Sequence, residues 1–300
     1  MPLHFSCPHC QEQTLVDDEF AGHSGNCIQC GRPIVVPGVP ADHTAAAVAQ
    51  RARRGRRLYW PLLAVVGLAV VGAAVGMFTL ALALMQPALQ VARANSLRTQ
   101  CARNLRQIGA ALIAYEAEHG SLPPAYLADA QGKPQHSWRV LILPYLGAKE
   151  KELYRQYDLS VPWNSPQNLL VQAQMPPVFA CPADPNAAPR YETNYLVVVG
   201  KSSLFPGAAA LRRAQASDGV EQTIMVVEVR GAGVGWMEPK DLVEGVVLYQ
   251  VGIDIGGNHP NGANVLMASG VAEYLPLSMP PEHVQALLSP AGNEPNPLDE

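Results

Sequence analysis

The sequence is poor in charged and aromatic side chains, which make up 15% and 6% of its 300 residues. The formal net charge is −4 at pH 7, so the chain has no overall excess of positive charge and no nucleic acid partner is expected. Hydrophobic residues at 48% exclude an intrinsically disordered chain, and 6 cysteines are too few for a small disulfide scaffold.

Several motifs that would indicate an enzyme or a nucleotide site are also missing. The sequence has no G-x-S-x-G nucleophile elbow, and its Gly-rich stretch 254–262 lacks the lysine of a P-loop. The chain contains residue types that could form a catalytic triad, namely Asp254, His259 and either Ser137 or Ser269. Their order in the chain does not identify a triad, because triads are recognised by geometry. We therefore expect no enzyme and assign no catalytic residues.

One long segment contains no charged side chain at all. It runs from Leu58 to Met85, which is 28 residues, and as a helix it would span about 42 Å. A bilayer core of about 30 Å needs about 20 residues, whereas a cleaved signal peptide would be shorter and closer to the N-terminus. We predict a retained transmembrane helix over 58–86. Gly72 and Gly76 form a G-x-x-x-G pair, which is either a helix–helix contact or simply the small residues common in spanning helices.

The charges that flank this segment predict its orientation. Five arginines precede it, and only Arg93 and Arg98 follow it closely. Arginine resists translocation, so we place the N-terminal side in the cytoplasm, where the arginines would also contact anionic lipid. The five arginines are Arg51, Arg53, Arg54, Arg56 and Arg57.

Four cysteines near the N-terminus have the spacing of a zinc ribbon. Cys7 and Cys10 form one C-x-x-C pair, and Cys27 and Cys30 form a second after a gap with room for a hairpin. Four thiolates can hold Zn²⁺ tetrahedrally at about 2.3 Å. All positions are then filled, so the metal would be structural, and a reducing cytoplasm argues against two disulfides. We predict a zinc ribbon over 1–37, with a possible protein partner, and a basic linker over 38–57.

The remainder of the chain predicts an α+β domain. Apolar residues recur every three or four positions from Leu97 to Tyr115, which indicates a helix over 87–119 that ends at Gly120. A short helix is expected within 138–146. Strands are expected at 194–199, 222–229, 262–267 and 271–275, the last two joined by a tight turn. We therefore predict that the long helix is covered by an antiparallel sheet in a domain over 120–288, followed by a disordered tail over 289–300.

Two cysteines lie outside the ribbon, Cys101 on the predicted helix and Cys181 in a loop. On the predicted topology both lie in an oxidising compartment, so we expect a disulfide between them, with two separate free thiols as the alternative. Arg139 could pair with Glu228 or Glu238.

Many short motifs after residue 90 occur in the order found in a known family. They include Gln100–Gly109, Leu122–Tyr126, His136–Val140, Pro162–Pro166 and Phe179–Pro182, and they continue to His259. This part of the chain resembles the pilin-like family called domain of unknown function 1559, which is abundant in planctomycete bacteria. The resemblance implies a pilin-like long N-terminal helix packed on an antiparallel sheet, in a protein of the bacterial inner membrane.

The chain departs from that family's pattern in two places. Family members begin with a prepilin signal of the G-F-T-L-x-E type, whereas this chain has Arg54–Trp60 before its apolar segment. An Asp-Gly-Ser turn of the family is replaced by Ala268–Gly270. We predict a membrane-anchored, pilin-like structural or interaction protein of the cell envelope, with its C-terminal domain periplasmic or extracellular. The alternative is a transmembrane sensor whose outer domain binds a ligand and whose ribbon recruits a cytoplasmic partner.

Overall fold

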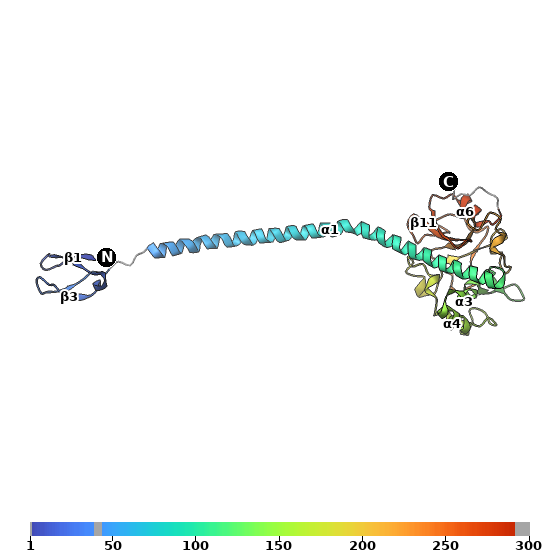
Figure 1. The fold of residues 1–300 in the computed structure, drawn as a ribbon, viewed down its shortest axis with the longest axis horizontal. Helices are drawn as coiled ribbons and strands as arrows, with labels where there is room; N and C mark the ends of the chain where they lie inside the picture. Colours follow the sequence, from blue (N-terminus) through green and yellow to red (C-terminus); the bar gives the residue numbers. More distant parts are fainter. Residues whose placement is uncertain (1, 39–43, 292–300) are drawn as a thin grey trace. The chain divides into compact units, whose positions relative to one another are not determined.

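The computed structural model describes residues 2–38 and 44–291. The chain divides into two compact units, Met1–Ala83 and Leu84–Glu300. One helix, α1 (Thr44–His119), contributes residues to both units. Figure 1 shows the elements in chain order by colour.

Two small antiparallel hairpins form the start of the first unit. Strand β1 (Leu3–Ser6) pairs with β2 (Gln13–Val16), and β3 (Ser24–Asn26) pairs with β4 (Pro33–Val35). Each hairpin encloses one C-x-x-C pair, so the hairpins surround the cysteine pairs and do not lie in the gap between them as expected. A single 3₁₀ turn, η1 (Asp18–Phe20), connects the two hairpins.

Helix α1 begins at Thr44, earlier than expected. The segment 44–57 of the predicted linker is therefore helical, and residues 39–43 of that linker lie outside the described residues. Alanine, the strongest helix former, recurs between 45 and 52 and accounts for the early start. From residue 59 the helix is long and apolar enough to cross a membrane.

The second unit contains a four-stranded antiparallel sheet with strand order β12-β11-β9-β7. Three of these strands fall within the segments predicted from the sequence, and β12 extends one residue beyond its predicted end at 275. The tight turn at 268–270 joins β11 to β12, with Gly270 at a φ of 90°. The α+β class is thus confirmed. The strands are β7 (Tyr195–Leu196), β9 (Ile224–Glu228), β11 (Gly262–Met267) and β12 (Ala272–Pro276).

The last turns of α1 pack on one face of this sheet. Leu105, Ile108 and Leu112 are fully buried against residues that include Val226 and Leu266. Gly109 lies so close to β11 that an added Cβ would be 2.9 Å from Leu266 Cδ1. The opposite face packs against helix α6 (Pro281–Leu288), which lies beside β11 in Figure 1.

The connecting segments hold more helix than the sequence predicted. The expected helix within 138–146 is confirmed as α2 and α3, whereas α4, α5 and α6 were missed, the last two because each begins with a proline. Proline is favoured in the first helical turn, and α5 starts at Pro166 behind a Ser165 cap. These elements are β5 (Tyr126–Ala128), β6 (Pro134–Ser137), α2 (Trp138–Leu141), α3 (Leu143–Leu146), α4 (Ala148–Gln156), α5 (Pro166–Gln172), η2 (Pro177–Phe179), η3 (Ala188–Arg190), β8 (Val198–Val199), η4 (Arg213–Gln215) and β10 (Leu242–Val243).

The start of the predicted disordered tail is ordered where it is described. Pro290 accepts a hydrogen bond of 3.2 Å from the Ser217 hydroxyl through its carbonyl oxygen. Residues 292–300 of that tail lie outside the described residues.

A buried ion pair joins α2 to the loop before β10. Arg139 and Asp241 have side chains that are 0% and 1% exposed. Arg139 also donates to Ser137 Oγ at 2.7 Å and to the Tyr195 carbonyl at 3.1 Å. The expected partners were wrong. Glu238 offers Arg139 only its backbone carbonyl, and Glu228 lies beside His259 instead.

Candidate metal centre

The four ribbon cysteines come together as the sequence predicted. The ligand atoms of Cys7, Cys10, Cys27 and Cys30 all lie within 4.8 Å of one another. The Sγ atoms of Cys7 and Cys30 are 3.8 Å apart, as are those of Cys10 and Cys27. A tetrahedron with metal–sulfur distances of about 2.3 Å has edges of about 3.8 Å. The four thiols therefore fit a tetrahedral metal ion.

The two C-x-x-C turns have the same hydrogen-bond pattern. The backbone N–H of Gln11 donates to the Cys7 carbonyl, and that of Gly31 donates to the Cys27 carbonyl, both at 2.8 Å. Gln11 and Gly31 both have positive φ, at 58° and 67°. The ribbon is thus built from two equivalent turns, each of which aims two sulfurs at a common point.

The crowded thiols strongly affect one another's ionisation. The backbone N–H of His9 lies 3.5 Å from Cys7 Sγ and is the main cause that lowers the pKa of Cys7 to about 6. A backbone hydrogen bond from Glu12 favours the thiolate of Cys10, but partial loss of solvent and the three neighbouring thiols together raise the pKa of Cys10 to about 12. Successive thiolates repel one another, and a bound divalent cation would remove that repulsion.

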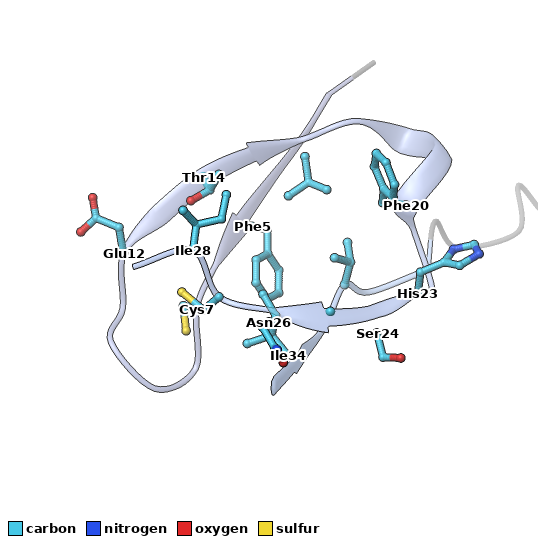
Figure 2. A pocket seen from close by; sticks show the side chains of 14 residues that line it. Phe5, Cys7, Glu12, Thr14, Phe20, His23, Ser24, Asn26, Ile28 and Ile34 are labelled. Carbon is cyan, nitrogen blue, oxygen red and sulfur yellow. The ribbon is translucent and has the colours of Figure 1, made fainter. Parts of the chain in front are cut away.

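The ribbon also contains an apolar hollow of about 370 Å³ that is lined by residues from all four of its strands. Figure 2 shows Phe5 near its centre, with Cys7 and Ile34 close to Phe5 and Phe20 farther along the wall. Among the described ribbon residues 2–37, the only apolar residues that are buried are Phe5, Cys7, Cys27 and Val36. So small an apolar core would leave much of the ribbon's folding free energy to an ion bound by the four thiols.

We expect substitutions at the positive-φ residues of the two turns to have opposite effects on the stability of the ribbon. We expect Gln11→Gly to stabilise the ribbon by about 1 kcal/mol, because glycine avoids the steric cost of the left-handed region. Gly31→Gln is the matched control, and it should destabilise the ribbon by a similar amount because its added Cβ meets nothing within 4 Å and only φ is strained. The rate of metal release to a chelator from the full chain measures both. Equal rates for the two variants would contradict this account.

The sequence prediction for Cys101 and Cys181 is half right. The two side chains are neighbours and both are buried, but both are free thiols, so the expected disulfide is not formed. Burial raises the pKa of Cys101, whereas the neighbouring Cys101 and His259 side chains lower the pKa of Cys181. The physical reason is that each sulfur has another partner. Cys101 Sγ donates to Glu228, and Cys181 Sγ contacts His259.

The residues combined into a triad on paper each have other partners. Ser137 Oγ accepts from Arg139, and Asp254 Oδ2 accepts from the Leu248 N–H at 2.7 Å. His259 is the residue whose significance the sequence did not show, because Cys181 and Glu228 are brought to it only by folding.

Comparison with known proteins gives one match. The model of a family described as a protein of unknown function (DUF1559) matches residues 90–241. No curated protein and no solved structure matches the chain.

Proposed function

This chain belongs to the DUF1559 family, whose function is unknown, and we propose that it is a single-pass, membrane-anchored protein of the bacterial cell envelope. Its role is pilin-like, structural or interaction-based, and not catalytic. The N-terminal ribbon holds a structural Zn²⁺ in the cytoplasm. The domain that follows α1 lies in the periplasm or outside the cell.

The exposed apolar length of α1 is the observation that carries this proposal. Trp60 and Leu68 are each 77% exposed, and Leu84 is 70% exposed. The most apolar window of this helix has none of its residues buried within the protein. So long an apolar surface is costly in water and is satisfied by lipid.

The family and the fold support the pilin-like part. The end of α1 packs on an antiparallel sheet, which is the arrangement that the family resemblance implies. The four thiols of the ribbon match the tetrahedral geometry that Zn²⁺ prefers, and the reducing cytoplasm keeps them available as ligands.

Protease protection in membrane vesicles tests the proposed orientation. We expect protease to cleave within 38–57 and release the ribbon from inverted vesicles, whose cytoplasmic face is outward, and to leave this segment uncut in right-side-out vesicles. Replacing the five arginines between 51 and 57 by glutamine should yield a mixed orientation, because they are the charges that resist translocation. Lys149→Gln with Lys151→Gln is the control, which should leave the orientation unchanged. Protection of residues 1–57 in inverted vesicles would contradict the proposal, as would recovery of the intact chain without detergent.

A second spanning helix is a proposed partner of α1 at Gly72 and Gly76. A Cβ at either glycine would meet nothing within 4 Å in the described part of the chain, so this side of the helix is open to a close approach. Crosslinking in detergent should give a dimer, and the double variant Gly72→Leu with Gly76→Leu should not. The same amount of crosslinked dimer for the unchanged chain and the double variant would reject this contact.

A sensor that recruits a cytoplasmic partner is the second candidate, and the exposed apolar side chains of the ribbon favour it. Ile28 is 94% exposed, Val35 64% and Leu15 59%. We expect Ile28→Asp to abolish co-purification of a cytoplasmic protein with the full chain. Leu170→Asp, at a position that is 73% exposed in the other unit, is the control that retains it. If no cytoplasmic protein co-purifies differently with the two variants, the sensor function is rejected and only the anchoring role remains.

A further inference from the structure

Four buried ligand-type side chains meet beneath the part of α1 that packs on the sheet. Cys101 comes from α1 itself, Cys181 from the loop after η2, Glu228 from the end of β9 and His259 from the loop before β11. The residues are 0%, 1%, 0% and 5% exposed in that order. One ligand atom from each lies within 4.8 Å of all the others.

The separations between these atoms suit a tetrahedral metal ion. Cys101 Sγ is 3.1 Å from Glu228 Oε2, and Cys181 Sγ is 3.4 Å from His259 Nε2. His259 Nε2 is 3.3 Å from the other oxygen of Glu228, Oε1. A tetrahedral zinc site with ligand distances of about 2.0–2.3 Å has edges of about 3.3–3.8 Å, so small adjustments suffice to bring all four atoms into coordination.

The orientation of His259 separates this arrangement from a catalytic triad. In a triad the histidine uses one ring nitrogen for the nucleophile and the other for the carboxylate. Here the same nitrogen, Nε2, faces both Cys181 and Glu228. A nitrogen aimed at the centre of a ligand group is the arrangement of a metal ligand, and the burial of Cys181 leaves no access for a substrate.

We propose that Cys101, Cys181, Glu228 and His259 bind a structural Zn²⁺. Coordination replaces the two thiol S–H bonds by S–Zn bonds and releases two protons to solvent, while Glu228 binds as the carboxylate and His259 as the neutral imidazole. All four positions are then filled by protein atoms, so the ion fastens α1, β9 and two loops together and takes no substrate.

Surrounding side chains already support the ligand set. The Asn258 and Asn264 amides donate to the two oxygens of Glu228 at 2.9 and 3.2 Å. The Tyr195 hydroxyl donates to Cys101 Sγ at 3.2 Å. Tyr195 and Glu228 are register partners on neighbouring strands, so the sheet directs the Tyr195 hydroxyl and the Glu228 carboxylate toward α1. Such donors orient ligands and offset the single negative charge that remains on two thiolates, one carboxylate and Zn²⁺.

Metal content of the full chain in detergent tests the proposal. To remove the ribbon's contribution, the starting protein carries Cys→Ser at 7, 10, 27 and 30. We expect this protein to retain one zinc ion per chain and to lose it when Cys181→Ser or His259→Gln is added. Ala111→Ser, which also places a hydroxyl on the buried face of α1, is the control that should retain the metal.

Cobalt substitution supplies a readout that does not depend on the added variants. In the protein without ribbon cysteines, Co²⁺ should give a tetrahedral spectrum. Its thiolate charge-transfer intensity should be roughly half of that of a four-thiolate site, because only two thiolates bind the ion. If Cys181→Ser or His259→Gln fails to fold, this spectrum and the metal content of the starting protein decide the question.

Two results would overturn the proposal. One is a Cys101–Cys181 disulfide, detected as a mass lower by two hydrogens with no zinc bound. The other is a metal-free protein in which both thiols react with a thiol reagent after unfolding and Co²⁺ gives no tetrahedral spectrum.

Discussion

Cys27→Ser is expected to unfold the ribbon over residues 1–37 while the unit from Leu84 onward stays folded. Cys27 is one of four thiols arranged for a tetrahedral ion, and the ribbon has almost no other apolar interior. Zinc binding supplies about 10–16 kcal/mol of apparent free energy in small zinc domains, which exceeds what the two hairpins provide by themselves. Limited proteolysis of the full chain should show rapid cleavage between 1 and 37 in the variant and after treatment with a chelator.

His9→Gln is the matched control for that experiment. His9 lies in the other C-x-x-C turn, between Cys7 and Cys10, and its ring nitrogen Nε2 is 3.3 Å from the Pro33 carbonyl oxygen. Because His9 is not a ligand, the variant should keep its zinc and its resistance to protease. A ribbon that resists protease equally well after complete metal removal would show that the ion is not what folds it.

Arg139→Met is expected to destabilise the second unit by about 3–5 kcal/mol, because it leaves the buried carboxylate of Asp241 without its counter-ion. Asp241 accepts hydrogen bonds from Arg139, from Trp138 Nε1 at 3.2 Å and from the Val197 N–H at 3.0 Å. The midpoint of chemical unfolding of this unit measures the loss. Arg155→Met is the control, because Arg155 forms an exposed pair with Glu152 that contributes about 0–1 kcal/mol.

The loss in Arg139→Met should also depend on pH. Burial already raises the pKa of Asp241 to about 6 despite the nearby arginine, and removal of that arginine should raise it further. A carboxyl group whose pKa is higher in the folded state binds its proton more readily there, so folding is favoured at low pH and disfavoured as pH rises through the folded pKa. The variant should therefore be closer to the wild type at about pH 5 than at about pH 8. A loss that is constant over this range would mean that Asp241 is not the source of the penalty.

The elements with a strong repeating pattern could be predicted from the sequence. The apolar face of α1 from Leu97 to Tyr115 and the valine-rich strand β9 both lie where expected. The helix has one face that must be buried, and β9 is a continuous apolar run that is buried on both faces. The ribbon cysteines could also be predicted, since both pairs are close in the chain and chelation depends on that short spacing.

The pairing of distant side chains could not be predicted in the same way. Cys101 and Cys181 were correctly placed together, but the sequence offered only each other as partners, whereas the fold adds Glu228 and His259. Arg139 was assigned the wrong acid for the same reason. Asp241 reaches it because the loop before β10 returns to α2, and no local pattern encodes that return.

The close approach of α1 to the sheet at Gly109 has a consequence well away from that residue. An alanine there would place its methyl group 2.9 Å from Leu266 Cδ1 and 3.4 Å from the Gly270 Cα, so either Leu266 must swing aside or the helix must lift. Cys101 lies about 12 Å back along the same rigid rod. The absence of a side chain at Gly109 thus sets the distance between α1 and the sheet, and with it the distance between the thiol of Cys101 and Glu228.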